Sequence, residues 1–347
     1  PGAWLGVDAA QQHYLSANYT HVARDFLARG ANVIAQLVAK RTVAGEVQLS
    51  LGSNPDVTVD LLPQIEAART TGRDIVLIGA VHPRLPFMFG GACIDPARFD
   101  YLMDHPRYDY ELFCPPNLPL RTVDHAIAMR VGALVPDGGT LQIGIGELGD
   151  ALVYSLLLRH LQNGAWRAIL EALLEAGVAR NLDEATFAEL RRCGVFRADT
   201  CYHDGRIRTP EGKWLPADLG DATVRRTLAE QCLGRELQGG IAAHTAFFLG
   251  PRGFYAKLRE MPERELRRID MCGVGFVNQL YGADYELRCL QRRDARFVNT
   301  AMMMTLLGAA VSDTLENGRV VSGVGGQYNF VSMAHALPGA RAILCLR

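Results

Sequence analysis

The chain has 347 residues, 49% of them hydrophobic and 21% charged, a composition typical of a soluble globular protein with room for two domains. A formal net charge of −1 argues against nucleic-acid or anionic membrane partners. No apolar run reaches the roughly 18 residues that a membrane span needs. The eight cysteines are scattered without a CxxC pair, which favours reduced thiols in the cytoplasm over a disulfide framework or a zinc site.

Along the chain, short apolar runs alternate with segments of helical periodicity. The apolar runs predict buried strands, and the periodic segments between them predict helices. In chain order these are a strand at 74–81, a helix at 123–135, a strand at 140–146, a helix at 150–161 and a strand at 341–346. This order predicts the α/β class with mainly parallel sheets.

Two irregular stretches suggest how the elements are grouped. Residues 105–122 contain four prolines and predict a connection between two α/β domains. Residues 203–221 are polar and rich in turn formers, which predicts an exposed hairpin or an insertion. We therefore expect one domain at 1–118 and a second at 119–347, with an insertion around 160–238.

Glycines gather at two places where chemistry could occur. Gly144 and Gly146 separate a strand from a helix, so backbone N–H groups there could approach an anionic ligand, although a plain tight turn has the same pattern. Gly323, Gly325 and Gly326 could aim N–H groups at an oxyanion or form a β-bulge.

A nicotinamide-dependent dehydrogenase is a further alternative for the first of these stretches. Gly144, Gly146 and Gly149 have the G-x-G-x-x-G spacing of dinucleotide-binding loops, a pattern that is weak evidence by itself. No acidic residue for a ribose is evident about 20 residues further on. The missing ribose-binding acid therefore disfavours this alternative.

Five stretches, in order, resemble the acetyl-CoA hydrolase/CoA-transferase family, which includes acetate, butyrate and 4-hydroxybutyrate CoA-transferases. The matching stretches are 81–104, 137–152, 247–258, 297–304 and 317–331. The resemblance implies two α/β domains with the active site in the cleft between them. It implies an acyl-CoA and a carboxylate acceptor as substrates, coenzyme A bound as substrate, no metal, and a homodimer.

The resemblance also assigns roles to individual residues. Asn299 matches the family's asparagine, which helps backbone amides to hold the developing oxyanion, and Gly323 begins its glycine loop. Family members split the transfer in two through a glutamate that attacks the thioester. The positions expected to line the acyl-CoA or CoA site are Gly144, Ile145, Gly146, Glu147, Leu148, Gly325, Gly326 and Gln327.

The family's nucleophilic glutamate has no counterpart at the matching position. Thirteen residues before the Gly194–Val195 pair, where the family keeps the glutamate, this chain has Asn181. Two carboxylates could substitute: Glu184, which could equally be a solvated surface residue, and Glu147 in the glycine stretch. A charged family stretch is replaced by methionines at 302–304, which could also be core filler.

Two functions therefore remain open. The first is a CoA-transferase or acetyl-CoA hydrolase that acts on a short-chain acyl-CoA. The second is a catalytically impaired homologue that binds acyl-CoA without the nucleophile. Family members extend beyond both ends of this sequence, so we expect the chain to be a fragment, its second domain cut short, or a short divergent paralogue. His82, His244 and His335 lack metal-binding spacing and are expected to be satisfied or surface residues.

Overall fold

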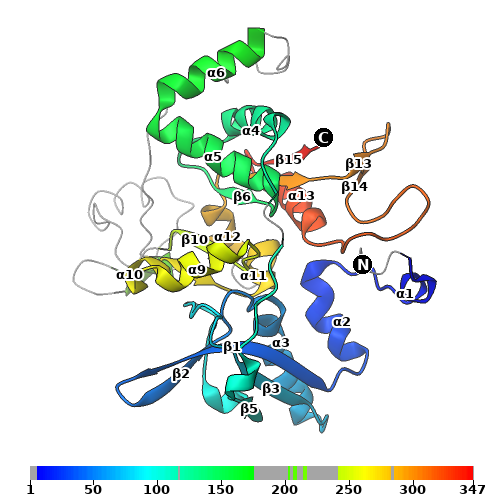
Figure 1. Ribbon diagram of the computed structural model, residues 1–347, viewed down its shortest axis with the longest axis vertical. Helices are drawn as coiled ribbons and strands as arrows, with labels where there is room; N and C mark the ends of the chain where they lie inside the picture. The colour runs from blue at the N-terminus through cyan, green and yellow to red at the C-terminus, as the bar shows by residue number, and fades with distance from the viewer. Residues whose placement is uncertain are drawn as a thin grey trace.

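A computed structural model describes residues 6–115, 118–175, 241–282 and 285–346, together with the backbone of three short strands between 202 and 216. Two α/β units are stacked along the long axis of the molecule (Figure 1), and residues 241–282 lie between them. This arrangement confirms the predicted α/β class. No helix within the described residues is long and apolar enough to cross a membrane.

The first unit is built on a five-stranded sheet in the order β4-β2-β1-β3-β5. Its centre is parallel, because β1 pairs with β3 and β3 with β5, whereas β2 and β4 join antiparallel at one side. The predicted strand at 74–81 is confirmed as β3. The strands are β1 (Val33–Val43), β2 (Glu46–Ser50), β3 (Val76–Val81), β4 (Cys93–Ile94) and β5 (Tyr101–Met103).

Helices and a distant part of the chain complete the core of the first unit. The buried cluster there includes Leu61 and Ile65 of α3 (Asp56–Thr70) and Leu27 of α2 (Val22–Ala28). Leu258 and Met271, which follow almost 200 residues later, belong to the same cluster. Those residues come from the segment with β10 (Ala243–Thr245), α9 (Arg252–Glu260), α10 (Glu263–Leu266), β11 (Ile269–Met271), α11 (Val274–Asn278) and α12 (Tyr285–Gln291).

The second unit is a wholly parallel sheet in the order β15-β12-β6. Its strands are β6 (Leu141–Ile143), β12 (Arg296–Thr300) and β15 (Arg341–Cys345). On one face it packs against α4 (Thr122–Leu134) and α5 (Glu147–Leu161), and on the other against α13 (Gln327–Ala336). Successive residues of β12 point to opposite faces, so Val298 joins the first core and Phe297 the second. The strands and helices predicted here are confirmed.

Three smaller features complete the fold: a hairpin, the connection between the two sheets, and helix α6. The polar segment forms the predicted hairpin, since β8 (Arg206–Arg208) pairs antiparallel with β9 (Trp214–Pro216), and β7 (Tyr202–His203) adds to β8. The proline-rich stretch lies between β5 of the first sheet and α4 of the second. Helix α6 (Asn163–Glu175) packs Trp166 and Leu170 against α4.

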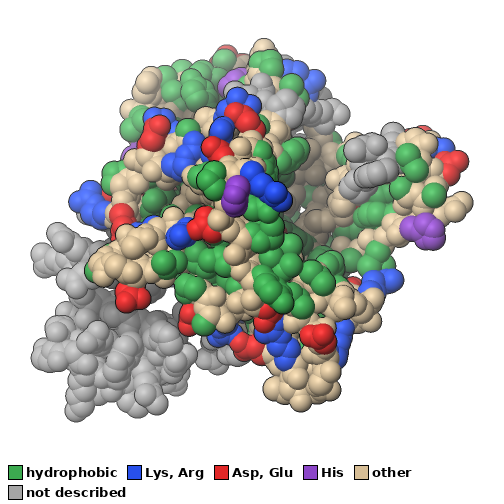
Figure 2. Space-filling model, turned by 60° about the horizontal axis from the view of Figure 1, so that its bottom comes forward, with side chains coloured by type: hydrophobic (Ala, Val, Ile, Leu, Met, Phe, Trp, Pro, Cys, Tyr) green, Lys and Arg blue, Asp and Glu red, His purple; other side chains and the backbone are tan. Residues whose placement is uncertain are grey.

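The methionine stretch is not core filler. Met302 and Met304 are each 44% exposed, Met302 just before and Met304 within the hairpin of β13 (Met303–Met304) and β14 (Ala310–Val311). The tip of that hairpin holds Leu306 and Leu307, both fully exposed. On the face seen from the side of the first sheet, Lys and Arg are interspersed with Asp and Glu (Figure 2), as expected from the near-zero net charge.

Candidate active site

The best-defined contact of the candidate site is an amide pair at the carboxyl edge of the second sheet. Asn299 of β12 donates from Nδ2 to Oε1 of Gln142 on β6, at 3.1 Å. Gln142 donates back from Nε2 to Oδ1 of Asn299, at 3.3 Å. No sequence motif predicts a role for Gln142, although it is the only polar side chain within the apolar strand β6. The carboxamide expected to hold an oxyanion is therefore held in place by a second carboxamide.

A glycine bend at 144–149, the first bend, lies directly beside this pair. The N–H of Gly144 donates to the carbonyl of Val298 at 2.9 Å, and a Cβ at position 144 would lie 3.6 Å from Oδ1 of Asn299. Two of the predicted residues, Gly144 and Asn299, are thus neighbours. The close approach that requires glycine is at Gly149, where a Cβ would lie 2.3 Å from the carbonyl oxygen of Gly144.

The other residues of the first bend differ in how far they are exposed to solvent and in what they contact. Gly146 has a φ of 106° and caps α5, and Ile145 is 58% exposed. Leu148 is 4% exposed and packs in the core beneath α4 and α5, so its side chain faces that core. Glu147 is half-buried in the first turn of α5, where the helix dipole favours a carboxylate. Burial, with the nearby charge of Glu147, raises the pKa of the Asp150 carboxyl.

The second bend, at 323–326, leads into α13 rather than forming a β-bulge. Gly326 caps the helix, and a Cβ there would lie 2.1 Å from Nδ2 of Asn278 on α11. Gly325 has a φ of 63°, a conformation that favours glycine. Gly323 is exposed, and a Cβ there would meet no heavy atom within 4 Å. The open end of the bend is therefore Gly323, and the packed end is Gly326.

A serine links the second bend to the end of β12. The Ser312 hydroxyl lies within hydrogen-bonding reach of Oε1 of Gln327, the first residue of α13, and of the carbonyl of Thr300, at 3.4 Å. Thr300 directly follows Asn299. The predicted residues Gln327, Asn299 and Gly144 thus belong to one connected set of contacts at the carboxyl edge of the second sheet, where parallel α/β sheets commonly bind ligands.

The N-terminal segment covers the second bend, an arrangement that no sequence pattern predicted. Gln11 exchanges hydrogen bonds with the backbone of Val320, at 3.0 and 2.8 Å. The N–H of Tyr19 donates to the carbonyl of Gly325 at 3.3 Å, and its hydroxyl donates to the carboxylate of Asp56 on α3. Burial, followed by the charge of Asp56, raises the pKa of Tyr19. The segment therefore ties the second bend to the first unit.

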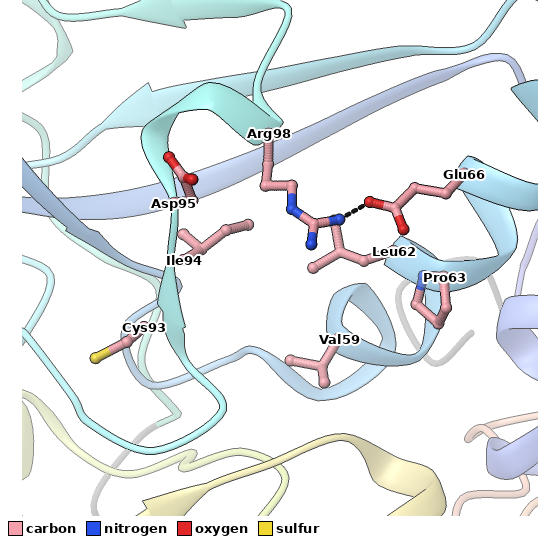
Figure 3. Close-up of a pocket in the computed structure, with 8 residues that line it drawn as sticks. All are labelled: Val59, Leu62, Pro63, Glu66, Cys93, Ile94, Asp95 and Arg98. Carbon is pink, nitrogen blue, oxygen red and sulfur yellow. Dashed lines mark ion pairs between the residues drawn. The ribbon is translucent and has the colours of Figure 1, made fainter.

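Two cavities open elsewhere, on the first unit, and neither is lined by a predicted site residue. The first, of about 330 Å³, lies between α3 and β4. Arg98 points across it toward Glu66, and Cys93 lies at its far side (Figure 3). The second, of about 400 Å³, is lined by Arg69, Asp100 and their neighbours. Asn181 and Glu184 lie outside the described residues.

Comparison with known proteins confirms the resemblance. Residues 250–347 match the acetyl-CoA hydrolase/transferase C-terminal domain family, a range that contains Asn299 and the second bend. The 4-hydroxybutyrate coenzyme A transferase of Clostridium kluyveri is 23% identical over 300 residues, which are 86% of this chain and 52% of that protein. The chain thus spans about half the length of this curated relative.

Solved structures show the same fold. A point mutant of RipA has a TM-score of 0.58 and 21% identity, covering 95% of this chain and 59% of that one. RipA from Yersinia pestis has a TM-score of 0.55 and 19% identity, covering 95% and 58%. A 4-hydroxybutyrate CoA-transferase from Porphyromonas gingivalis has a TM-score of 0.51 and 17% identity, covering 96% and 63%. The fold is therefore that of the CoA-transferases, and this chain spans less than two thirds of these structures.

Proposed function

We propose that this chain acts on a short-chain acyl-CoA thioester, as a CoA-transferase with a carboxylate acceptor or as an acetyl-CoA hydrolase. The observation that carries the proposal is the contact between the first bend and Asn299, at the sheet edge where the family match and the glycine stretch converge. A carboxamide N–H and nearby backbone N–H groups are suitable donors to the oxyanion that forms when a thioester carbonyl is attacked.

Glu147 is the described carboxylate best placed to act as the nucleophile in this proposal. It follows Gly146 directly, one turn of chain from the contact between Gly144 and Asn299. Its carboxylate oxygen would attack the thioester carbonyl carbon, and the C–S bond would break to release CoA thiolate and leave an acyl-glutamyl anhydride. The thiolate would then attack the glutamyl carbonyl, giving a glutamyl-CoA thioester and a free acyl carboxylate.

The second half-reaction distinguishes the two activities. In a transferase, the acceptor carboxylate attacks the glutamyl-CoA carbonyl and expels CoA thiolate, leaving a mixed anhydride. The thiolate then attacks the acceptor carbonyl of that anhydride, which forms the new acyl-CoA and releases the Glu147 carboxylate. In a hydrolase, water takes the place of the acceptor, so CoA appears as a free thiol. The acyl group is not fixed by the described residues, and we propose only that it is short.

The test is a titration of the full chain with CoA and acetyl-CoA while free thiol is measured, with and without acetate or butyrate as acceptor. Five described cysteines are free thiols, so a parallel sample without acetyl-CoA supplies the background. Release without acceptor indicates the hydrolase, and acyl exchange that depends on the acceptor indicates the transferase. Borohydride reduction during turnover should convert the thioester-bearing carboxylate to an alcohol that peptide mass spectrometry locates. Binding of neither ligand would refute the proposal.

The second candidate function is an acyl-CoA-binding protein without turnover, favoured by Asn181 at the position where the family keeps its glutamate. It predicts that CoA binds and no thiol is released, and that Asn181→Glu restores release. If Asn181→Glu binds CoA tightly and remains inactive, the assignment of position 181 is wrong.

The proposal also covers the cellular compartment, the oligomeric state and the domain boundary of the protein. We propose a cytoplasmic homodimer with a boundary between its domains near residue 118. Free thiols at the described cysteines are compatible with a reducing compartment. Size-exclusion chromatography with light scattering would measure the mass of the assembly.

A further inference from the structure

A histidine, an aspartate and a cysteine that are not among the candidate active-site residues converge where β10 pairs with β11. His244 lies on β10 and Asp270 on β11, and the parallel register pairs these two residues side by side. Cys272 follows Asp270 by two residues, the spacing that returns a side chain to the same side of an extended chain. We refer to these three residues as the His–Asp–Cys cluster.

The Asp270 carboxylate accepts hydrogen bonds within the cluster, and the thiol of Cys272 donates to the carbonyl of Thr245 at 3.7 Å. Nδ1 of His244 lies 2.8 Å from Oδ2 of Asp270, and the N–H of Gly91 donates to Oδ1 of Asp270 at 3.3 Å. One nitrogen of the histidine, one carboxylate oxygen and the sulfur of Cys272 all lie within 4.8 Å of one another. Cys272 is 8% exposed, so its sulfur is enclosed rather than solvated.

The electrostatics of the cluster differ from those of an ordinary surface ion pair. The hydrogen bond from His244 lowers the pKa of Asp270, which remains a carboxylate. Burial, with the charge of that carboxylate, raises the pKa of Cys272 to about 12. A protonated thiol and an imidazole therefore surround one anion.

The backbone around the cluster is shaped to let these groups approach. Gly90 has a φ of 74°, and a Cβ there would lie 2.0 Å from Oδ1 of Asp270. A Cβ at Gly91 would lie 2.8 Å from the carbonyl of Met271. The ring centroids of Phe276 and His244 lie 4.9 Å apart. Substitution of either glycine would push the 90–91 turn away from the carboxylate.

We propose that the His–Asp–Cys cluster binds one divalent cation of the zinc class through a nitrogen, a carboxylate oxygen and a sulfur. Zinc accepts this mixed set of ligands, and three protein ligands leave a fourth position open. Binding would release the thiol proton, because the sulfur ligates as thiolate. Bonds of about 2.0–2.3 Å in a tetrahedral ion would hold the ligand atoms roughly 3.5 Å apart, so the His244–Asp270 contact would open and Cys272 would move inward.

The positions of the three ligands along the chain explain why no sequence motif predicts this metal site. Residues 244, 270 and 272 resemble no metal-binding spacing, and only the parallel pairing of β10 with β11 brings them together. A simple histidine–aspartate ion pair would account for two of the three side chains. It does not involve the enclosed sulfur, which lies within 4.8 Å of both the histidine nitrogen and the carboxylate oxygen.

Cobalt(II) and zinc(II) titrations of the chelator-treated full chain test the proposal without requiring turnover. We expect one tight site, a thiolate-to-cobalt charge-transfer band that zinc abolishes, and a higher melting temperature with zinc because the ion binds only the folded state. Cys272→Ser should abolish the band. His244→Gln, at a side chain that is one-third exposed, should fold normally and weaken binding about tenfold or more.

The matched control is Cys345→Ser, which removes another buried free thiol that lies in the core of the second sheet. It should leave the band and the affinity unchanged. A band that survives Cys272→Ser, an equal loss in Cys345→Ser, or the absence of a cobalt band in the unaltered chain would each overturn the proposal.

Discussion

The two glycine bends of the second unit use glycine at different places and for different neighbours. In the first bend, packing requires glycine at position 149, where a side chain would strike the backbone of Gly144. In the second bend, packing requires glycine at position 326, where a side chain would strike Asn278, while Gly323 faces open space. The first bend is thus closed on itself and presses against Asn299, and the second is closed at one end only. Glycine content alone does not distinguish the two.

The largest expected effect concerns the residue that the first bend contacts. Asn299→Ala removes the side-chain donor proposed for the oxyanion, and we expect the rate of CoA release to fall by about 100- to 1,000-fold. The rate of thiol release from acetyl-CoA at saturation measures it. Gln142→Ala is the matched control, since it breaks the amide pair but leaves the donor of Asn299 in place. Equal losses in both variants would mean that the Asn299 donor contributes nothing to the rate beyond its part in the amide pair.

The next effect is on stability and probes the closed bend. Gly149→Ala places a methyl group against a backbone carbonyl that cannot move without shifting β6, so we expect a loss of about 1–3 kcal/mol in the free energy of unfolding. Urea denaturation followed by circular dichroism measures it. Gly164→Ala, near the start of α6 and with no atom within 4 Å of the added carbon, should be neutral or stabilising by up to about 1 kcal/mol. Comparable losses in both would contradict the steric account.

In the second bend, alanine substitutions should reduce the free energy of unfolding by different amounts at the packed end and at the open end. Gly326→Ala meets a side-chain amide that can shift, so we expect a loss toward the lower end of about 1–3 kcal/mol. Gly323→Ala should change the free energy of unfolding by less than about 0.5 kcal/mol. In an Asn278→Ala background the effect of Gly326→Ala should shrink, because the two side chains would no longer compete for the same space. Additive losses in the double variant would show that some other neighbour is responsible.

Much of the second unit could be predicted from the sequence, because its parallel strands are short apolar runs and its helices have regular periodicity. The edge containing Asn299 was also predictable, since it depends on motif order. Gln142 was missed because one amide in an apolar strand has no motif, and its role arises only when β6 pairs with β12. The N-terminal segment over the second bend was missed because contacts such as Gln11 with Val320 join residues 309 positions apart.

The first unit contains long-range packing that local sequence patterns do not predict. Leu258 and Met271 pack into a core formed mainly by residues before position 100. No local sequence pattern predicts this long-range packing. The same long-range return of the chain places β11 beside Gly90 and thereby creates the His–Asp–Cys cluster. Hydrophobic periodicity predicts that a face is buried, but not which distant face buries it.

The smallest expected effect is a pKa change that tests the electrostatics of the first bend, in a variant that should also lose CoA release because Glu147 is the proposed nucleophile. Glu147→Gln removes the charge that assists burial in raising the pKa of Asp150, so that pKa should fall toward its ordinary value but not reach it. Nuclear magnetic resonance of the Asp150 carboxyl carbon during a pH titration measures the change. Because the folded-state pKa lies above the unfolded one, ionised Asp150 destabilises the fold at neutral pH, and the penalty disappears as the pH falls through the folded pKa. Glu147→Gln should therefore reduce the Asp150 penalty at neutral pH, an effect that vanishes in acid. Glu171→Gln on α6 is the control, and an equal shift of the Asp150 pKa there would rule out a local origin.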